Sequence, residues 1–251
     1  MEDVLLYFAL KYKGNFRDIY KAIREKERIN HSLFDDMKKD LHCRYTTIVS
    51  EDYPAKLKDI NCPPFVLFYY GDLSLLNEKI IAVIGTREYS QYGKDVTKDI
   101  VSQLAKQNYC TIAGLSTGID TLVHEETIKY NGKSIAILGC GIENCYPKCN
   151  QSLYDEMKNN HLIISEYPFD TKPQKEQFIM RNRLISALCN QLIVTECKTK
   201  SSTMITVGYA IEYDKDIFCV PSPVFSKYQG TNELIQSGAK LLVNIDDLRE
   251  E

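Results

Sequence analysis

The feature that most constrains the fold is a series of short, almost entirely apolar runs that alternate with amphipathic stretches after residue 45. The runs have strand length and lie at residues 46–49, 65–70, 80–85, 110–114, 134–139, 162–167, 191–196, 216–221 and 240–245. Uninterrupted apolar strands are typical of parallel sheets that are covered on both faces. Helical spacing of apolar residues appears between them, at residues 90–107, 118–131, 181–189 and 204–215. The alternation predicts an α/β fold, an extended Rossmann-like, doubly wound and mostly parallel sheet.

The first 44 residues have a different pattern. Apolar residues recur at three- and four-residue spacing over 2–12 and 15–28, with Gly14-Asn15 between the two stretches. This spacing predicts two helices, and a third short helix is expected at 32–41. We therefore expect a small all-α lobe at residues 1–44 and a Rossmann-like domain at 45–251.

Composition excludes several classes of protein. No apolar run approaches the roughly 18 residues that a membrane span needs, and the acidic N-terminus has no signal-peptide pattern. We expect a cytoplasmic protein with no membrane partner. The net charge of −3 argues mildly against nucleic acid as the main partner, but it does not exclude a local basic patch.

Nine cysteines are an odd number, and a cytoplasmic chain keeps them reduced. Cys140, Cys145 and Cys149 lack the paired spacing of a structural zinc site, so we expect no metal.

Phosphate-binding residue types follow five of the predicted strands. The loops carry Gly85-Thr86-Arg87, "GLSTGID", Lys148, the two arginines of "FIMRNRLIS", and Lys198 to Thr203. The carboxyl ends of parallel strands share one edge of a sheet, and ligands bind there. Helix N-termini, hydroxyls and cations are suited to holding phosphates. The residues alone predict a polyphosphate-binding rim.

Catalytic signatures are weak. "GCGIEN" lacks the third glycine of a dinucleotide fingerprint, and the chain has no P-loop motif, so we expect no cofactor. Asp120 and His124 stand four residues apart on a predicted helix, where a core role is favoured over a catalytic pair. We expect a binding protein rather than an enzyme.

Eight motifs in order resemble the DNA-processing protein A (DprA/Smf) family. They are "AVIGTREYSQYGK", "AGLSTGIDTLVHEETI", "SIAILGCGIENCYP", "ISEYP", "FIMRNRLISALC", "SSTMIT", "DIFCVPS" and "GTNELIQSGAKLL". The resemblance covers about residues 46–248. It implies a single-stranded DNA-binding homodimer of natural transformation and homologous recombination, which protects incoming strands and loads the RecA recombinase onto them. It also makes the helical lobe SAM-like, and we expect no C-terminal winged-helix domain.

The resemblance also implies a DNA site. Arg87 becomes the leading phosphate contact, Gly85 and Thr86 shape its turn, and Lys148, Arg181 and Arg183 would line the same pocket. Phe178, Tyr167 and Phe169 are candidates for stacking on bases. The full predicted set is Gly85, Thr86, Arg87, Ser90, Gly114, Ser116, Gly118, Lys148, Phe178, Arg181, Asn182, Arg183, Ser201, Ser202 and Thr203.

Two departures from the family pattern predict weaker binding of single-stranded DNA. Thr117 and Gln151 stand where members often have a basic residue, and each lost cation removes phosphate attraction. The dimer surface implied by the resemblance includes Leu234, Ile235 and Leu241, although about half of such apolar residues belong to a core.

A second reading is a nucleotide-binding sensor or a phosphoribohydrolase-like enzyme of the related Rossmann superfamily. Glu212 would stand near the position of the hydrolase glutamate. The glycine cluster of that motif is missing from "KSSTMITVGYAIE", which favours the binding protein.

Overall fold

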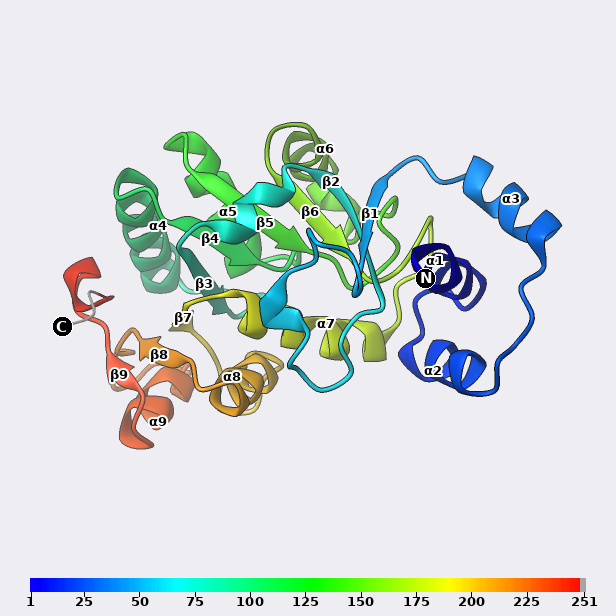
Figure 1. The fold of residues 1–251 in the computed structure, drawn as a ribbon. Helices are drawn as coiled ribbons and strands as arrows, with labels where there is room; N and C mark the ends of the chain where they lie inside the picture. Colours follow the sequence, from blue (N-terminus) through cyan, green and yellow to red (C-terminus); the bar gives the residue numbers. More distant parts are fainter. Residues whose placement is uncertain (249–251) are drawn as a thin grey trace.

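A nine-stranded sheet forms the centre of the computed structural model, which describes residues 1–248. The end of the predicted 45–251 domain, residues 249–251, lies outside the described residues. The strands are β1 (Arg44–Thr47), β2 (Val66–Gly71), β3 (Ile80–Gly85), β4 (Cys110–Ala113), β5 (Lys133–Ile137), β6 (Leu162–Ser165), β7 (Gln191–Glu196), β8 (Asp216–Cys219) and β9 (Lys240–Leu241). Their order is β1-β2-β6-β5-β4-β3-β7-β8-β9 (Figure 1).

Pairing confirms a mostly parallel sheet. The seven strands from β6 to β9 in this order are parallel to one another, and only β1 and β2, at one edge, pair antiparallel. From β3 the chain winds outward through β4, β5 and β6, and it then returns to β7 on the other side of β3. The crevice between diverging loops therefore lies at the carboxyl ends of β3 and β7.

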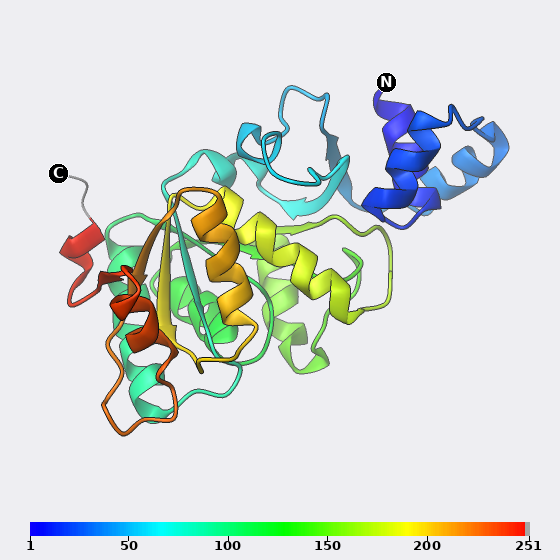
Figure 2. The ribbon, with the colours of Figure 1, turned by 90° about the horizontal axis from the view of Figure 1, so that it is seen from below.

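The helices of the structure cover both faces of the sheet or form the lobe that precedes it. They are α1 (Glu2–Lys11), α2 (Phe16–Arg24), α3 (His31–Lys39), α4 (Gln91–Lys106), α5 (Ile119–Lys129), α6 (Gln151–Asn160), α7 (Lys175–Leu188), α8 (Thr203–Glu212) and α9 (Gly230–Gln236). Figures 1 and 2 show α7 and α8 on the face opposite to α4.

Strand β3 illustrates why the apolar runs fold this way. Ile81 and Val83 pack with the residues of α4 and α5, whereas Ile80, Ala82 and Ile84 pack with those of α7 and α8. Successive side chains of a strand point to opposite faces, so a strand covered on both sides needs an apolar residue at every position.

The helical lobe α1–α3 precedes the sheet, and its helix α1 packs at the edge formed by β1 and β2. Leu6 and Phe8 of α1 share a core with Phe68 and Ile163 of the sheet. Gly14, at φ +75°, meets the Glu166 carbonyl so closely that a Cβ would lie 2.2 Å from its oxygen. No helix within residues 1–248 has the length and apolarity to cross a bilayer.

The predicted strands are all present, and β1 begins two residues earlier than expected. Helix α7 begins at Lys175, six residues before the predicted start. Helix α6 was not predicted, because few of its residues are apolar: among its ten residues only Tyr154 and Met157 are buried.

Candidate nucleic-acid interface

A pocket of about 830 Å³ opens at the carboxyl ends of β3, β4 and β7, between their loops and helices α7 and α8. We call it the rim pocket. It is lined by Ile84, Gly85, Arg87, Ser116, Thr117, Asp120, Tyr146, Pro173, Gln174, Lys175, Phe178, Ile179, Arg181, Asn182, Ile185, Lys200, Ser201, Ser202, Thr203, Met204, Ile205 and Thr206. Its place is the switch point of the sheet, where such folds bind ligands.

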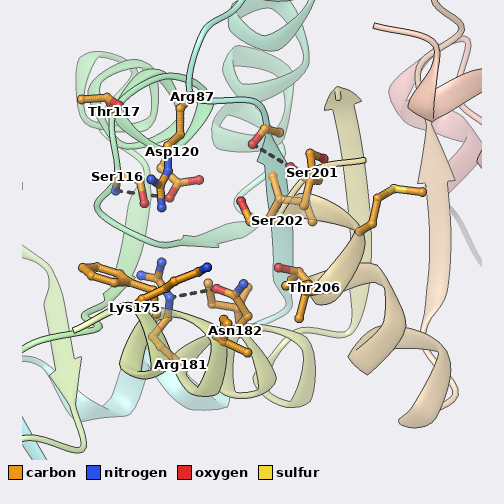
Figure 3. A pocket seen from close by; sticks show the side chains of 18 of the residues that line it. Arg87, Ser116, Thr117, Asp120, Lys175, Arg181, Asn182, Ser201, Ser202 and Thr206 are labelled. Carbon is orange, nitrogen blue, oxygen red and sulfur yellow. Dashed lines mark hydrogen bonds between the residues drawn. The ribbon is translucent and has the colours of Figure 1, made fainter. Parts of the chain in front are cut away.

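Cations reach the rim pocket from three directions. Arg87 comes from the loop after β3, Lys175 from the start of α7, and Lys200 from the loop after β7. All three side chains are exposed, and none forms an ion pair within residues 1–248. Figure 3 shows Arg87 and Lys175 on opposite sides of the opening. Their charges are free to meet an anion.

The Arg87 turn is fixed by its backbone. Thr86 donates its N–H to the Glu196 carbonyl (2.8 Å) and accepts the Ile119 N–H (3.1 Å). Gly118 stands at φ +88°, and a Cβ there would lie 2.5 Å from the Arg87 Cα. A side chain at residue 118 would therefore displace the turn. The backbone at Arg87 is therefore held in place, and only the side chain of Arg87 is free to move.

Arg181 forms the floor of the rim pocket. The residue is 5% exposed, and its guanidinium donates to the Ile137 carbonyl and, through Nε, to Asn182 Oδ1 at 3.1 Å. A Cβ on Gly114 would lie 2.5 Å from both Arg181 Nη1 and Asp120 Oδ2, so the glycine leaves room for these two groups.

Asp120 is the carboxylate of the rim pocket. Its Oδ2 accepts the Ser116 N–H at 3.3 Å. Burial raises the pKa of Asp120, against the opposing effect of Arg181, and burial likewise lowers the pKa of Arg181. The two groups are thus close, and each costs free energy to bury.

The N-terminus of α8 also faces the rim pocket through Ser201, Ser202 and Thr203. Thr203 Oγ1 donates to the Gly85 carbonyl at 3.0 Å, which ties α8 to the end of β3. Among residues 1–248, no side chain caps the first turn of α8, and the Ser201 hydroxyl is buried without a hydrogen-bond partner. Unpaired donors at a helix N-terminus attract phosphate oxygens.

Two aromatic rings lie at one side of the opening. Phe178 and Tyr146 have centroids 5.6 Å apart at an interplanar angle of 45°, and Tyr146 is 49% exposed. Phe178 was expected from the sequence, whereas Tyr146 was not. Tyr167 is buried, and neither Tyr167 nor Phe169 lines the rim pocket.

Other predicted site residues lie outside the lining of this pocket. Arg183 is 2% exposed and donates to both oxygens of Glu166, each at 2.6 Å, so it forms a buried ion pair instead of a wall of the rim pocket. Lys148 is exposed but does not line the pocket. Thr86, Ser90, Gly114 and Gly118 build the loops beneath it. Lys175 was missed because the helix was predicted to start at Arg181.

A second cavity of about 820 Å³ lies between the helical lobe and α7, and we call it the lobe hollow. It is lined by Lys11, Tyr12, Lys13, Gly14, Asn15, Phe16, Arg17, Asp18, Cys62, Glu166, Tyr167, Thr171, Gln174, Glu176, Gln177, Met180 and Arg183. Gln174 lines both cavities. Helix α7 therefore separates two spaces of nearly equal volume.

The residues considered for catalysis do not form a catalytic group. His124 is fully buried and bonds Ser134 Oγ (2.7 Å) and the Gly114 carbonyl (2.5 Å), not Asp120. Because a carbonyl only accepts, Nε2 carries the proton. Burial lowers the pKa of His124 to about 4. Glu212 lies at the far end of α8, bonded to Asn61, and does not line the rim pocket.

The three residues predicted for a dimer surface differ in exposure. Leu234 is 9% exposed and packs in the main core, Ile235 is half-buried against the same core, and Leu241 on the edge strand β9 is 47% exposed. Leu241 is therefore the most accessible of the three.

Comparison with known proteins adds to this geometry. Residues 44–251 match the family model of DNA recombination-mediator protein A. The chain is 40% identical over 206 residues to DNA processing protein DprA of Bacillus subtilis, which covers 81% of this chain and 69% of that protein. Identity to the Streptococcus pneumoniae protein is 37% over 206 residues, covering 82% of this chain and 73% of that one.

Two solved structures share this fold. DNA processing protein A of Streptococcus pneumoniae superposes with a TM-score of 0.82 at 32% identity, covering 98% of this chain and 92% of that one. The Helicobacter pylori protein, whose structure concerns its single-stranded DNA binding mode, gives 0.75 at 32% identity, covering 82% and 94%. The chain belongs to the DNA recombination-mediator protein A family.

Proposed function

We propose that this chain binds single-stranded DNA in the rim pocket. The observation that carries the proposal is the set of three unpaired cations, Arg87, Lys175 and Lys200, around one cavity that also holds an aromatic pair. Cations that follow the backbone and rings that accept bases are the two requirements of single-strand binding. A similar structure, the Helicobacter pylori protein, is described by its single-stranded DNA binding mode.

In this proposal the Arg87 guanidinium binds a phosphate through two parallel hydrogen bonds. Lys200 and the first turn of α8 hold a neighbouring phosphate, and Lys175 closes the opposite side. The exposed face of Tyr146, beside Phe178, accepts a base by stacking. Contacts to phosphates carry no sequence information, so binding is independent of base sequence.

The same reasoning gives the strength of the salt effect. For single strands, the logarithm of affinity falls with the logarithm of salt concentration with a slope of about −0.7 per phosphate neutralised. Three exposed cations therefore give a slope of about −2. Basic residues at 117 and 151 would steepen it.

The test is fluorescence anisotropy of labelled oligo-dT at two salt concentrations, with an unlabelled duplex as competitor. We expect salt-sensitive binding that the duplex competes poorly, and an affinity at least about tenfold lower for Arg87→Ala, because a charge-assisted contact is lost. An affinity that Arg87→Ala leaves unchanged would refute the proposal.

The wider role is proposed from the family. The protein would protect incoming strands in the cytoplasm during transformation or recombination and load a RecA-type recombinase onto them. The measurement is recombinase-driven strand exchange on strands covered by single-strand binding protein, which the chain should accelerate.

A homodimer through the β9 edge belongs to the same proposal. Leu241→Glu would place a charge in the contact and give a folded monomer by light scattering. A persistent dimer in that variant would exclude this surface.

A further inference from the structure

The carboxylate of Glu196 lies at the N-terminus of α4, the first helix after the central strand β3. Glu196 ends β7 and pairs in register with Gly85 at the end of β3. Its Oε2 accepts the Ser90 N–H at 2.8 Å, and its Oε1 accepts the Ser90 hydroxyl at 2.5 Å. Ser90 Oγ in turn accepts the Gly93 N–H at 3.0 Å. A carboxylate thus takes the place at this helix end where an external anion could bind.

The surrounding residues are fitted to this carboxylate. A Cβ on Gly93 would lie 2.4 Å from Glu196 Oε2 and 2.6 Å from its Cδ, so a side chain at residue 93 would displace the carboxylate. Glu196 is 2% exposed and forms no ion pair with any residue from 1 to 248. A buried carboxylate without a cation is costly unless donors and a helix dipole compensate it. The N-terminus of α4 supplies both.

The position of the carboxylate has a chemical meaning. In doubly wound folds the turn after the first strand and the N-terminus of its helix hold the pyrophosphate of a dinucleotide. Here the Ser90 N–H is taken by the Glu196 carboxylate, and the Gly93 N–H is taken by the Ser90 hydroxyl. A phosphate entering this turn would meet the carboxylate and find these two donors in use.

Glu196 also holds the turn that carries Arg87. Its carbonyl accepts the Thr86 N–H at 2.8 Å, and its carboxylate holds Ser90. Arg87 lies between these two attachment points. Glu196 occupies the position where an anion could bind, and it also holds both ends of segment 86–90. The Arg87 guanidinium reaches the rim pocket from this segment.

We propose that Glu196 is the specificity-determining residue of this site: its carboxylate excludes pyrophosphate and nucleotide phosphates from the β3–α4 turn and positions Arg87 for the phosphates of a strand. The claim that Glu196 positions Arg87, the positioning half, rests on the proposed binding of single-stranded DNA. The claim that Glu196 excludes pyrophosphate, the exclusion half, does not depend on that function.

The exclusion half is tested by Glu196→Ala, with inorganic pyrophosphate as the probe in isothermal titration calorimetry. Pyrophosphate that the wild type binds at the free cations of the rim pocket sets the baseline, and Glu196→Ala should bind one further equivalent. The matched control is Glu126→Ala, which removes another buried carboxylate, 4% exposed and paired with Lys98 and Lys129 outside the rim pocket. That control should bind pyrophosphate as the wild type does. A folded Glu196→Ala variant with the stoichiometry and affinity of the wild type would overturn the proposal.

The positioning half is tested by a double-mutant cycle with Glu196→Gln and Arg87→Ala on oligo-dT. The amide has one acceptor oxygen for the two Ser90 donors, so the turn loosens while its packing is kept. We expect about fivefold weaker binding for Glu196→Gln alone, since one hydrogen bond to a charged group is lost. Arg87→Ala should then cost less in the Glu196→Gln background than in the wild type. A purely structural role would leave the two effects additive, and additivity overturns this half.

The two arms separate the possible failures. A wild type that binds no oligo-dT refutes the proposed function, and the pyrophosphate experiment still decides the role of Glu196. If Glu196→Ala does not fold, which circular dichroism would show, the same pyrophosphate titration of the nearly isosteric and uncharged Glu196→Gln tests the exclusion, and the double-mutant cycle tests the positioning.

Discussion

The rim pocket and the lobe hollow are nearly equal in volume, and each is lined by four cationic side chains. They differ in their acids. The rim pocket has one carboxylate, Asp120, whereas the lobe hollow has three, Asp18, Glu166 and Glu176. In the hollow Arg183 is held by Glu166 and Lys11 is paired with Glu27, while the exposed Lys13 and Arg17 form no ion pair within residues 1–248. Four cations and one carboxylate give the rim pocket a formal lining charge of +3, and four cations and three carboxylates give the lobe hollow +1. The comparison teaches that the two cavities differ in net charge more than in volume or in number of cations.

Helix α7 contributes one arginine to each cavity. Arg181 and Arg183 are two residues apart, and residues at this spacing point to nearly opposite sides of a helix. Arg181 therefore faces the rim pocket, and Arg183 faces Glu166 under the lobe. The "RNR" motif thus places one arginine in the lining of the rim pocket and one in a buried ion pair.

The largest effect should come from breaking the buried pair of the lobe hollow. Arg183→Ala leaves Glu166 buried without its cation, which costs about 3–5 kcal/mol of unfolding free energy. Urea denaturation measures this loss, and the oligo-dT affinity of the folded protein should stay at the wild-type value. The double variant Arg183→Met with Glu166→Gln should recover much of the stability. Loss of oligo-dT binding in folded Arg183→Ala would instead place Arg183 in the DNA site.

An intermediate effect should come from acid, through His124 beneath the rim pocket. Its pKa is lowered to about 4 by burial, while the unfolded chain takes up this proton near pH 6.5. The contribution to stability is therefore complete above about pH 6.5 and is lost as pH falls toward 4. The loss reaches about 3 kcal/mol. The unfolding free energy, measured in urea at several pH values, should fall less with acid in His124→Gln than in the wild type. The same pH dependence in both proteins would contradict the prediction.

The smallest effects should distinguish the two cavities directly. Lys200→Ala removes a free cation of the rim pocket, so the salt slope for oligo-dT should become shallower by about 0.7. Arg17→Ala removes an exposed cation of the lobe hollow and should change neither slope nor affinity. Equal responses of the two variants would mean that a strand contacts both cavities.

The fold followed from the sequence because its strongest signal, apolar residues at every strand position, is a direct effect of burial on two faces. The cationic loops were also predicted, since the carboxyl ends of parallel strands share one edge. The roles within those loops were not. Nothing in the sequence separates Arg181 from Arg183, because their difference depends on the partner each meets in space, Asn182 or Glu166.

The sequence also did not predict the roles of two other residues, for physical reasons. Tyr146 gave no signal because an exposed tyrosine in a loop resembles any other surface residue until its ring is seen beside Phe178. Glu196 was predicted only as the end of a strand, and its function depends on Ser90 and Gly93, about one hundred residues earlier in the chain.

The strand order also sets a sequence of events during synthesis. Central strand β3 can pair with β4 early, but its second partner, β7, is made much later in the chain. Strand β2 likewise waits for its partner β6. A growing chain that has not reached residue 191 already contains Arg87, Ser116 and Lys175, but it lacks Glu196 and the α8 N-terminus. Contacts between such distant segments form late because closing long loops costs entropy. A nascent or truncated chain therefore has most of the cations of the rim pocket before it has the residue that holds the Arg87 turn.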